Sequence, residues 1–151
     1  AGMIRRRAPL RRTGNKYGAR VTYVDGRRMG SQLEADYFRH LQSLEAQGLI
    51  RDLQDHPRYE LVPGMHYVAD ATFVVVAMGL RITADAKGAA TKGGRFPSVC
   101  RVWKAMMDHP LVVVERRGRD FIETKRVLPK PLPAGWRGHA TRPARATEAV
   151  A

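Results

Sequence analysis

The sequence predicts an α/β protein in which helices flank a mixed β-sheet. Segments 31–47 and 96–108 are predicted as helices, and the segments around them are rich in β-branched and aromatic residues. The order is one helix, about three strands, a second helix and two more strands, which favours a mixed sheet with helices against it. With 151 residues, 44% of them hydrophobic, the chain can bury one core of ordinary size.

The first half begins with a predicted hairpin, because residues 17–29 loosely alternate apolar and polar side chains. Residues 31–47 form the clearest helix, with one apolar stripe and Ser31 as a favourable N-cap. Residues 50–62 predict a strand, which Pro57 interrupts because proline cannot donate a ladder hydrogen bond.

The second half contains a strongly β-prone run that Gly79 turns back on itself, so residues 66–87 are predicted as a hairpin. Residues 96–108 predict the second helix, with a proline in the first turn, where proline is tolerated. Two strands follow, over 111–115 and 119–127, joined by an Arg-Arg-Gly turn.

The positive charge lies mainly at the two ends of the chain. Lys and Arg number 27 against 14 Asp and Glu, a net charge of +13. Residues 1–20 hold seven bases and no acid, residues 129–151 form a proline-rich basic tail, and the predicted domain, 21–128, is only mildly basic. Flexible arms of this kind are either solvated tails or segments that bind the phosphates of DNA or RNA.

Several classes of protein are disfavoured. No apolar run approaches the roughly 20 residues of a membrane helix, so no membrane association is expected. The single cysteine, Cys100, allows neither an intrachain disulfide nor a cysteine-rich zinc site. No signal peptide is visible, which predicts a cytoplasmic protein.

Three ionisable residues in the predicted 66–87 hairpin suggest chemistry. Asp70 lies in its first arm, while Asp85 and Lys87 end the second and share one face, since side chains alternate along a strand. Carboxylates in such apolar stretches are costly unless they are paired or bind metal. Metal-dependent cleavage of phosphodiesters needs converging carboxylates, and a nearby lysine can orient water or offset developing charge.

Each of these residues also has a purely structural interpretation. Asp85 and Lys87 would form an ordinary ion pair on an exposed strand, and Asp70 would cap a strand end. Glu34 fits the capping-box pattern that begins at Ser31, although its place beside the apolar stripe also points it partly inward, where it would serve as a fourth ligand.

Glu34, Asp70 and the Asp85-x-Lys87 pair together resemble the PD-(D/E)XK nuclease superfamily. Neighbouring segments extend this likeness, over roughly residues 16–115, to a family of small phage-encoded endonucleases. These segments are Lys16-Tyr17-Gly18-Ala19, Asp25-Gly26, Ser31-x-x-Glu34-Ala35, Pro57-Arg58-Tyr59-Glu60-Leu61, Tyr67-Val68-Ala69-Asp70 and Asp85-x-Lys87-Gly88.

The resemblance implies a restriction-endonuclease-like core and a Mg²⁺ or Mn²⁺ cofactor, with no small-molecule cofactor. Asp70, Asp85 and the carbonyl of Ala86 would hold the metal, Glu34 would complete the site, and Lys87 would lie beside the nucleophilic water. Members with a helical glutamate resemble archaeal-type Holliday-junction resolvases, which implies a homodimer that cuts branched DNA at a four-way junction. A phage-encoded enzyme would act in the host cytoplasm.

The chain departs from those resolvases in three respects. They often place a catalytic serine ahead of the first acid, whereas this chain has no serine between Ser43 and Ser98, so that role is either empty or taken by another group, for which His66 is a candidate. Ala69 replaces the usual proline. Asp85 replaces the more usual glutamate, so that a metal would lie closer to the strand or be bridged by water.

Basic residues near the predicted site and in the N-terminal arm are candidates for binding DNA. The loop that contains Lys92 and Arg95 has two glycines that allow close approach to phosphate; the alternative interpretation is a flexible surface loop. Arg101 and Lys104 share one helix face. The full predicted set is Arg5, Arg6, Arg7, Arg11, Arg12, Lys16, Arg20, Arg58, Lys92, Arg95, Arg101 and Lys104.

Three functions follow from these observations. The leading one is a metal-dependent, structure-selective DNA endonuclease, a junction resolvase that acts as a homodimer. The second is another nuclease of the same fold, such as a nickase, flap or restriction-type enzyme; a restriction enzyme needs a base-reading element, and no long insertion supplies one. The third is a non-catalytic basic module that binds nucleic acid, which explains the charge but not the acids in apolar strands.

Overall fold

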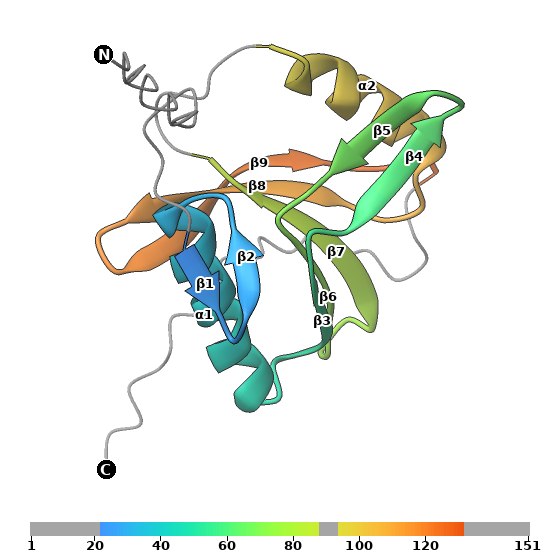
Figure 1. The fold of residues 1–151 in the computed structure, drawn as a ribbon. Coiled ribbons are helices and arrows are strands. Elements are labelled where there is room, and N and C mark those ends of the chain that lie inside the picture. Colours follow the sequence, from blue (N-terminus) through green and yellow to red (C-terminus); the bar gives the residue numbers. More distant parts are fainter. Residues whose placement is uncertain (1–21, 88–93, 132–151) are drawn as a thin grey trace, which may run out of the picture.

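A five-stranded mixed sheet forms the centre of the protein (Figure 1). The computed structural model describes residues 22–87 and 94–131. Strands β7 and β8 are parallel and all other neighbours in this sheet are antiparallel. In spatial order the strands are β3 (Ile50–Asp55), β6 (Ala71–Val75), β7 (Leu80–Ala86), β8 (Leu111–Arg117) and β9 (Asp120–Val127).

The two helices pack on opposite faces of this sheet because alternate side chains of its strands point to opposite faces. Helix α1 (Gln32–Ala46) buries Tyr37 and Leu41 in the same cluster as Ile82 of β7. Helix α2 (Phe96–Met106) buries Trp103 in a second cluster with Leu111 and Val127. Both predicted helices are confirmed, and the α/β fold is consistent with a restriction-endonuclease-like core.

Two short hairpins complete the described fold. Strands β1 (Thr22–Val24) and β2 (Arg27–Met29) lie beside α1, where Met29 packs against Phe38. Strands β4 (Arg58–Val62) and β5 (Met65–Val68) lie on the α2 side, where Leu61 joins the cluster around Trp103 (Figure 1). The predicted hairpin is therefore confirmed over 22–29, since residues 17–21 lie outside the described part, and the interruption near Pro57 is confirmed as well.

The prediction that 66–87 is a single hairpin is wrong in its first arm. Only β6 and β7 form that hairpin, with Gly79 in the turn at a φ of 62°. Residues 65–68 instead pair with β4, because the chain turns at Gly64 and bends at Ala69 and Asp70. Asp70 thus lies in the bend that precedes β6 and not within a strand.

The last two strands follow the prediction closely, although β8 extends to Arg117, so that the turn begins later than expected. The predicted arms 1–20 and 129–151 lie largely outside the described residues. No helix in the described part of the chain is long and apolar enough to cross a membrane.

Candidate metal centre

Asp70 is fixed at the end of β7 by two hydrogen bonds. Its backbone N–H donates to the carbonyl of Ala84 (3.2 Å), and its carboxylate Oδ2 accepts from the backbone N–H of Ala86 (2.7 Å). The bend before β6 therefore turns this carboxylate toward the residues that end β7, as the resemblance requires.

Asp85 and Lys87 lie on one face, as strand alternation predicted. Asp85 Oδ2 lies 2.7 Å from Lys87 Nζ and accepts a 2.5 Å hydrogen bond from the hydroxyl of Tyr67. The side chain of Asp85 is only 4% exposed and that of Lys87 is 29% exposed. The two residues do form an ion pair, but its carboxylate is buried and only its lysine is partly exposed.

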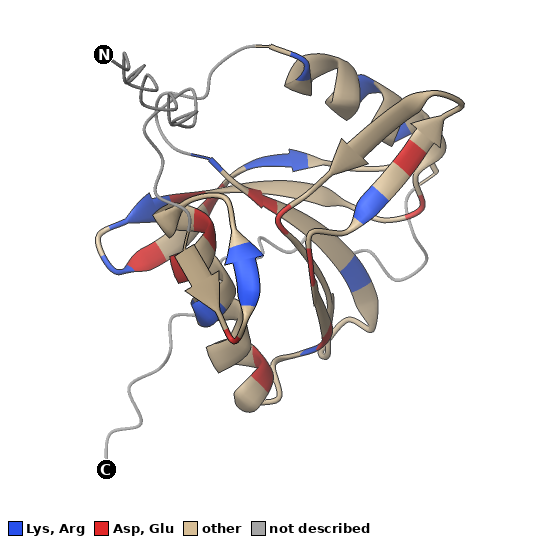
Figure 2. Ribbon diagram, viewed as in Figure 1, with Lys and Arg blue, Asp and Glu red and all other residues tan. Residues whose placement is uncertain are grey.

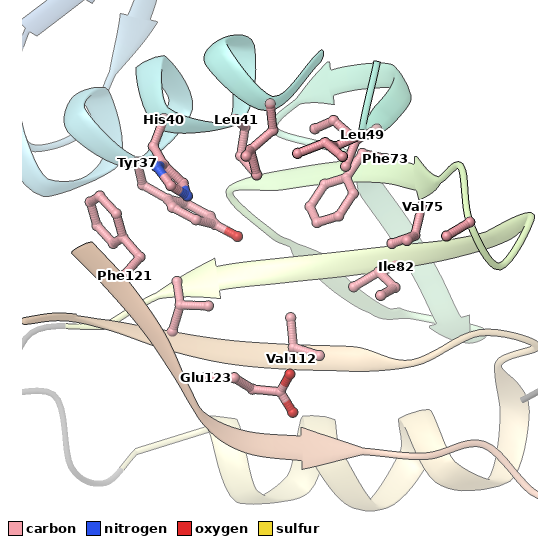
Figure 3. A pocket seen from close by; sticks show the side chains of 14 residues that line it. Tyr37, His40, Leu41, Leu49, Phe73, Val75, Ile82, Val112, Phe121 and Glu123 are labelled. Carbon is pink, nitrogen blue, oxygen red and sulfur yellow. The ribbon is translucent and has the colours of Figure 1, made fainter. Parts of the chain in front are cut away.

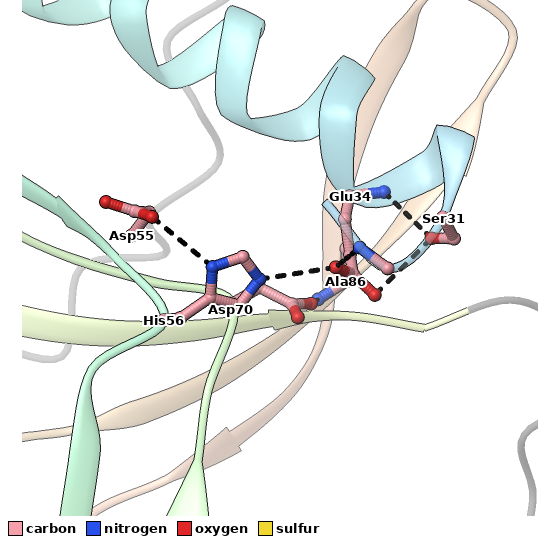
Figure 4. Close-up of polar contacts among 7 residues, drawn as sticks. Ser31, Glu34, Asp55, His56, Asp70 and Ala86 are labelled. Atoms are coloured by element: carbon pink, nitrogen blue, oxygen red, sulfur yellow. Dashed lines mark hydrogen bonds and ion pairs between the residues drawn. The ribbon is translucent and has the colours of Figure 1, made fainter. Parts of the chain in front are cut away.

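Glu34 both caps α1 and joins the acidic site (Figure 4). Its backbone N–H donates to Ser31 Oγ (3.2 Å), and its Oε2 accepts from the backbone N–H of Gly30 (2.7 Å). The same Oε2 lies 3.4 Å from Nε2 of His56. Ser31 thus caps α1 as predicted, whereas the Glu34 carboxylate accepts from Gly30, the residue before the N-cap, and also points toward His56.

His56 is the residue of this site that the sequence reasoning missed. One ligand atom each from Glu34, His56 and Asp70 lie within 4.8 Å of one another, so these three side chains can hold a metal ion. Nδ1 of His56 lies 3.4 Å from Asp55 Oδ2 (Figure 4). The only signal in the sequence was a histidine immediately before the strand-breaking Pro57.

Asp70 is the common neighbour of the other two acids. Burial raises the pKa of Asp70 well above its ordinary value, and the charges of Asp85 and Glu34 raise it further. The N–H of Ala86 and the charge of Lys87 oppose that rise. The other three predicted catalytic residues, Glu34, Asp85 and Lys87, are thus close enough to Asp70 for their charges to act on it.

The acids nevertheless approach Asp70 from different sides. Glu34 belongs to α1, on one face of the sheet, whereas Asp85 contacts Tyr67, which packs with the α2 cluster on the other face. Asp85 is not among the three residues whose ligand atoms meet within 4.8 Å. The structure therefore groups the predicted ligands in two parts that share Asp70.

A hollow at the surface gives access to Glu34, His56 and Asp70. Gly30, Val68 and Ala69 line it, together with the exposed Arg28 of β2. Arg28 is exposed and forms no ion pair within residues 22–87 and 94–131, so its guanidinium can meet an anion that enters the hollow. Arg28 was not among the predicted DNA-binding residues.

The predicted DNA-binding residues are described only in part. Arg58 on β4, Arg95 before α2, and Arg101 and Lys104 on α2 are exposed, and Figure 2 shows the basic positions along α2. His66, the candidate for the serine's role, lies on β5 opposite Glu60 and is not one of the three grouped ligands. The remaining predicted residues lie outside the described part: Arg5, Arg6, Arg7, Arg11, Arg12, Lys16, Arg20 and Lys92.

A second pocket, of about 230 Å³, lies between α1 and the sheet (Figure 3). Its walls are mostly apolar, including Phe73 and Ile82, with His40 and Glu123 as polar members. His40 Nε2 is buried and has no hydrogen-bond partner among the described residues. Among the described residues that line this pocket, no group of potential metal ligands is found, in contrast to the hollow beside Asp70.

The chain was compared with protein families, curated proteins and solved structures. A family model described as "Protein of unknown function (DUF1064)" matches residues 14–98, more than half of the chain and the whole segment from Glu34 to Lys87. No curated protein matches, and no solved structure matches.

Proposed function

We propose that this chain, which belongs to the DUF1064 family of proteins of unknown function, is a metal-dependent, structure-selective DNA endonuclease. The observation that carries the proposal is the meeting of Glu34 and Asp85 at Asp70. The two acids come from separate elements, and their charges raise the pKa of a carboxyl group that is already buried. Such an arrangement is unfavourable unless a cation compensates it.

The residues fit a hard divalent cation. Carboxylate and carbonyl oxygens are the ligands that Mg²⁺ and Mn²⁺ prefer. Asp70, Asp85, Glu34 and the carbonyl of Ala86 would hold it, with His56 as an additional ligand. When bound, such an ion polarises a phosphate and lowers the pKa of a bound water.

The other groups of the site would position substrate and water. Lys87 is held by Asp85 at 2.7 Å, and its ammonium lies 5.1 Å from the centre of the Phe96 ring, so its position is defined on two sides. An ammonium there would orient the attacking water or offset charge that develops on the phosphate. Arg28, at the edge of the hollow, would contact a phosphate that flanks the scissile bond.

We assign a four-way DNA junction as the substrate and a homodimer as the active form. The charge of +13 supports a polyanionic substrate, and the order of the acidic residues supports the likeness to junction resolvases. A two-fold symmetric dimer would present two sites to two opposed strands of a junction. Paired, symmetric cuts are the expected product.

The test is cleavage of an end-labelled four-way junction, and of its separate duplex arms, with Mg²⁺ or Mn²⁺. Wild-type protein should cut the junction in two symmetric positions, and Asp85→Ala should bind it without cutting. Glu60→Ala removes the same charge from an exposed position on β4 and should cut normally. Binding without cleavage by wild type, with either metal, would refute the proposal and favour a non-catalytic module.

Equal cleavage of the junction and its arms would instead support another nuclease of the same fold. Sedimentation of the protein with and without the junction tests the homodimer separately.

A further inference from the structure

We propose that His56 gives this centre a preference for a first-row transition ion that accepts imidazole, such as Mn²⁺ or Co²⁺, over Mg²⁺. The inference rests on the proposed function, since it concerns the same centre. It goes further by naming the class of ion and the residue that selects it.

The first support is the position of the imidazole. One ring nitrogen of His56 lies within 4.8 Å of a ligand atom of Glu34 and one of Asp70, and Nε2 is the nitrogen that faces Glu34. Its distance to Glu34 Oε2 is 3.4 Å, and the ring is about one-third exposed toward the hollow. An ion between the three side chains would therefore meet one nitrogen and two carboxylates.

The second support is the group on the far side of the ring. Nδ1 of His56 lies 3.4 Å from Asp55 Oδ2, and Asp55 is itself 3.5 Å from Nη1 of Arg27. Histidines that bind metal commonly donate their other ring N–H to a carboxylate, which fixes the tautomer and the direction of the free nitrogen. Asp55 is placed to do this for His56 and to direct Nε2 at the centre.

The backbone of His56 adopts a conformation that this residue does not usually prefer. Its φ is 46°, in the left-handed region, and Pro57 follows it, a position that favours extended backbone. The backbone N–H of His56 donates to the carbonyl of Asp70 (3.0 Å), which ties the ligand-bearing bend of Asp70 to the histidine. This hydrogen bond thus fixes the distance between the two ligand-bearing segments.

The chemistry of the ions gives the direction of the preference. Mg²⁺ binds oxygen ligands and keeps several waters, whereas imidazole favours transition ions, for which affinity rises from Mn²⁺ to Co²⁺ and Ni²⁺. A nitrogen in place of one oxygen therefore weakens Mg²⁺ relative to these ions. An all-oxygen site would show a smaller preference.

The experiment compares wild type, His56→Asn and His66→Asn. Asparagine tolerates a positive φ better than most residues, so His56→Asn removes the imidazole with little backbone strain. His66→Asn makes the same change on β5, at a histidine outside the three grouped ligands. Calorimetry without DNA gives the affinity for Mg²⁺, Mn²⁺ and Co²⁺, and pulsed electron paramagnetic resonance of bound Mn²⁺ detects a coordinated nitrogen.

We expect wild type and His66→Asn to bind Mn²⁺ and Co²⁺ more tightly than Mg²⁺ and to show the nitrogen coupling. His56→Asn should lose the coupling and about tenfold or more in affinity for Mn²⁺ and Co²⁺, the least that loss of a supporting group at a metal site costs. Its affinity for Mg²⁺ should change much less.

Cleavage by wild type without nitrogen coupling, or an equal loss of affinity for all three ions in His56→Asn, would overturn this inference and leave the nuclease proposal standing. Failure of wild type to bind any of the three ions, together with failure to cleave, would overturn both.

Discussion

Tyr67→Phe isolates the hydrogen bond that supports the buried carboxylate of Asp85. The Tyr67 hydroxyl donates to Asp85 Oδ2, and the whole residue Asp85 is 3% exposed. The aromatic ring itself lies edge-on to Trp103, with ring centres 6.2 Å apart. Phenylalanine keeps that ring contact and removes only the hydroxyl group.

The expected loss of stability depends on the contacts that the Asp85 carboxylate retains in Tyr67→Phe. A hydrogen bond to a charged group contributes roughly 1.5–3 kcal/mol. Because Lys87 still contacts the same oxygen at 2.7 Å, the loss should fall in the lower half of that range, about 1.5–2 kcal/mol. With a urea slope of about 2 kcal/mol/M, the unfolding midpoint should fall by roughly 1 M.

Urea unfolding followed by far-ultraviolet circular dichroism measures this loss, with Tyr23→Phe as the control because Tyr23 is 63% exposed. The same Tyr67→Phe change is then made in an Asp85→Ala protein, where the hydroxyl has lost its acceptor. Its cost there should approach zero. A loss below about 0.5 kcal/mol in the wild-type background, or the same loss in both backgrounds, would refute the reasoning.

Three further predictions concern the two hollows. Asp70→Asn should stabilise the metal-free protein at pH 7. The pKa of Asp70 is higher in the folded protein than in the unfolded chain, so the free energy of unfolding of wild type falls as pH rises from the unfolded to the folded pKa. Asparagine carries no charge and avoids this loss. Melting curves in chelator should show this advantage vanish near the ordinary carboxyl pKa of about 3.9. His40→Leu should raise the free energy of unfolding by about 1–3 kcal/mol, because it removes a buried nitrogen that has no hydrogen-bond partner among the described residues. Burial lowers the pKa of His40, so as pH falls the unfolded chain binds the proton at a higher pH than the folded protein does. The stability gained by His40→Leu, measured by urea unfolding, should therefore grow below pH 6.5, and a gain that does not change with pH would contradict this. Arg28→Ala should weaken junction binding and reduce the salt slope by about one, measured by filter binding, whereas an unchanged slope would remove Arg28 from the phosphate contacts.

Local rules predicted much of the site. Strand alternation put Asp85 and Lys87 on one face, and the capping box put Glu34 in the first turn of α1, because both depend only on spacing along the chain. Gly79 marked the β6–β7 turn for the same reason. These features needed no knowledge of which elements meet.

The missed features depend on long-range pairing. Residues 65–68 are as β-prone as β6, and propensity alone does not say which strand will be their partner. His56 lies at the break between β3 and β4 and itself adopts a left-handed backbone conformation. The pattern of apolar residues in the sequence does not indicate such a position. Glu34 and Asp85 reach Asp70 from opposite faces of the sheet because Asp70 lies in a bend. The sequence instead predicts a continuous strand at that position.

Gly30 lies so close to the Glu34 carboxylate that a substitution at Gly30 would move this carboxylate without changing its charge. A methyl group on Gly30 would lie 3.0 Å from Glu34 Oε1 and 3.1 Å from Oε2, so the carboxylate would have to shift by a few tenths of an ångström. Gly30→Ala therefore preserves every acid while altering their spacing. If catalysis depends on that spacing, the cleavage rate should fall in this variant although its net charge is that of wild type, and normal rates would show that Glu34 acts through its charge alone.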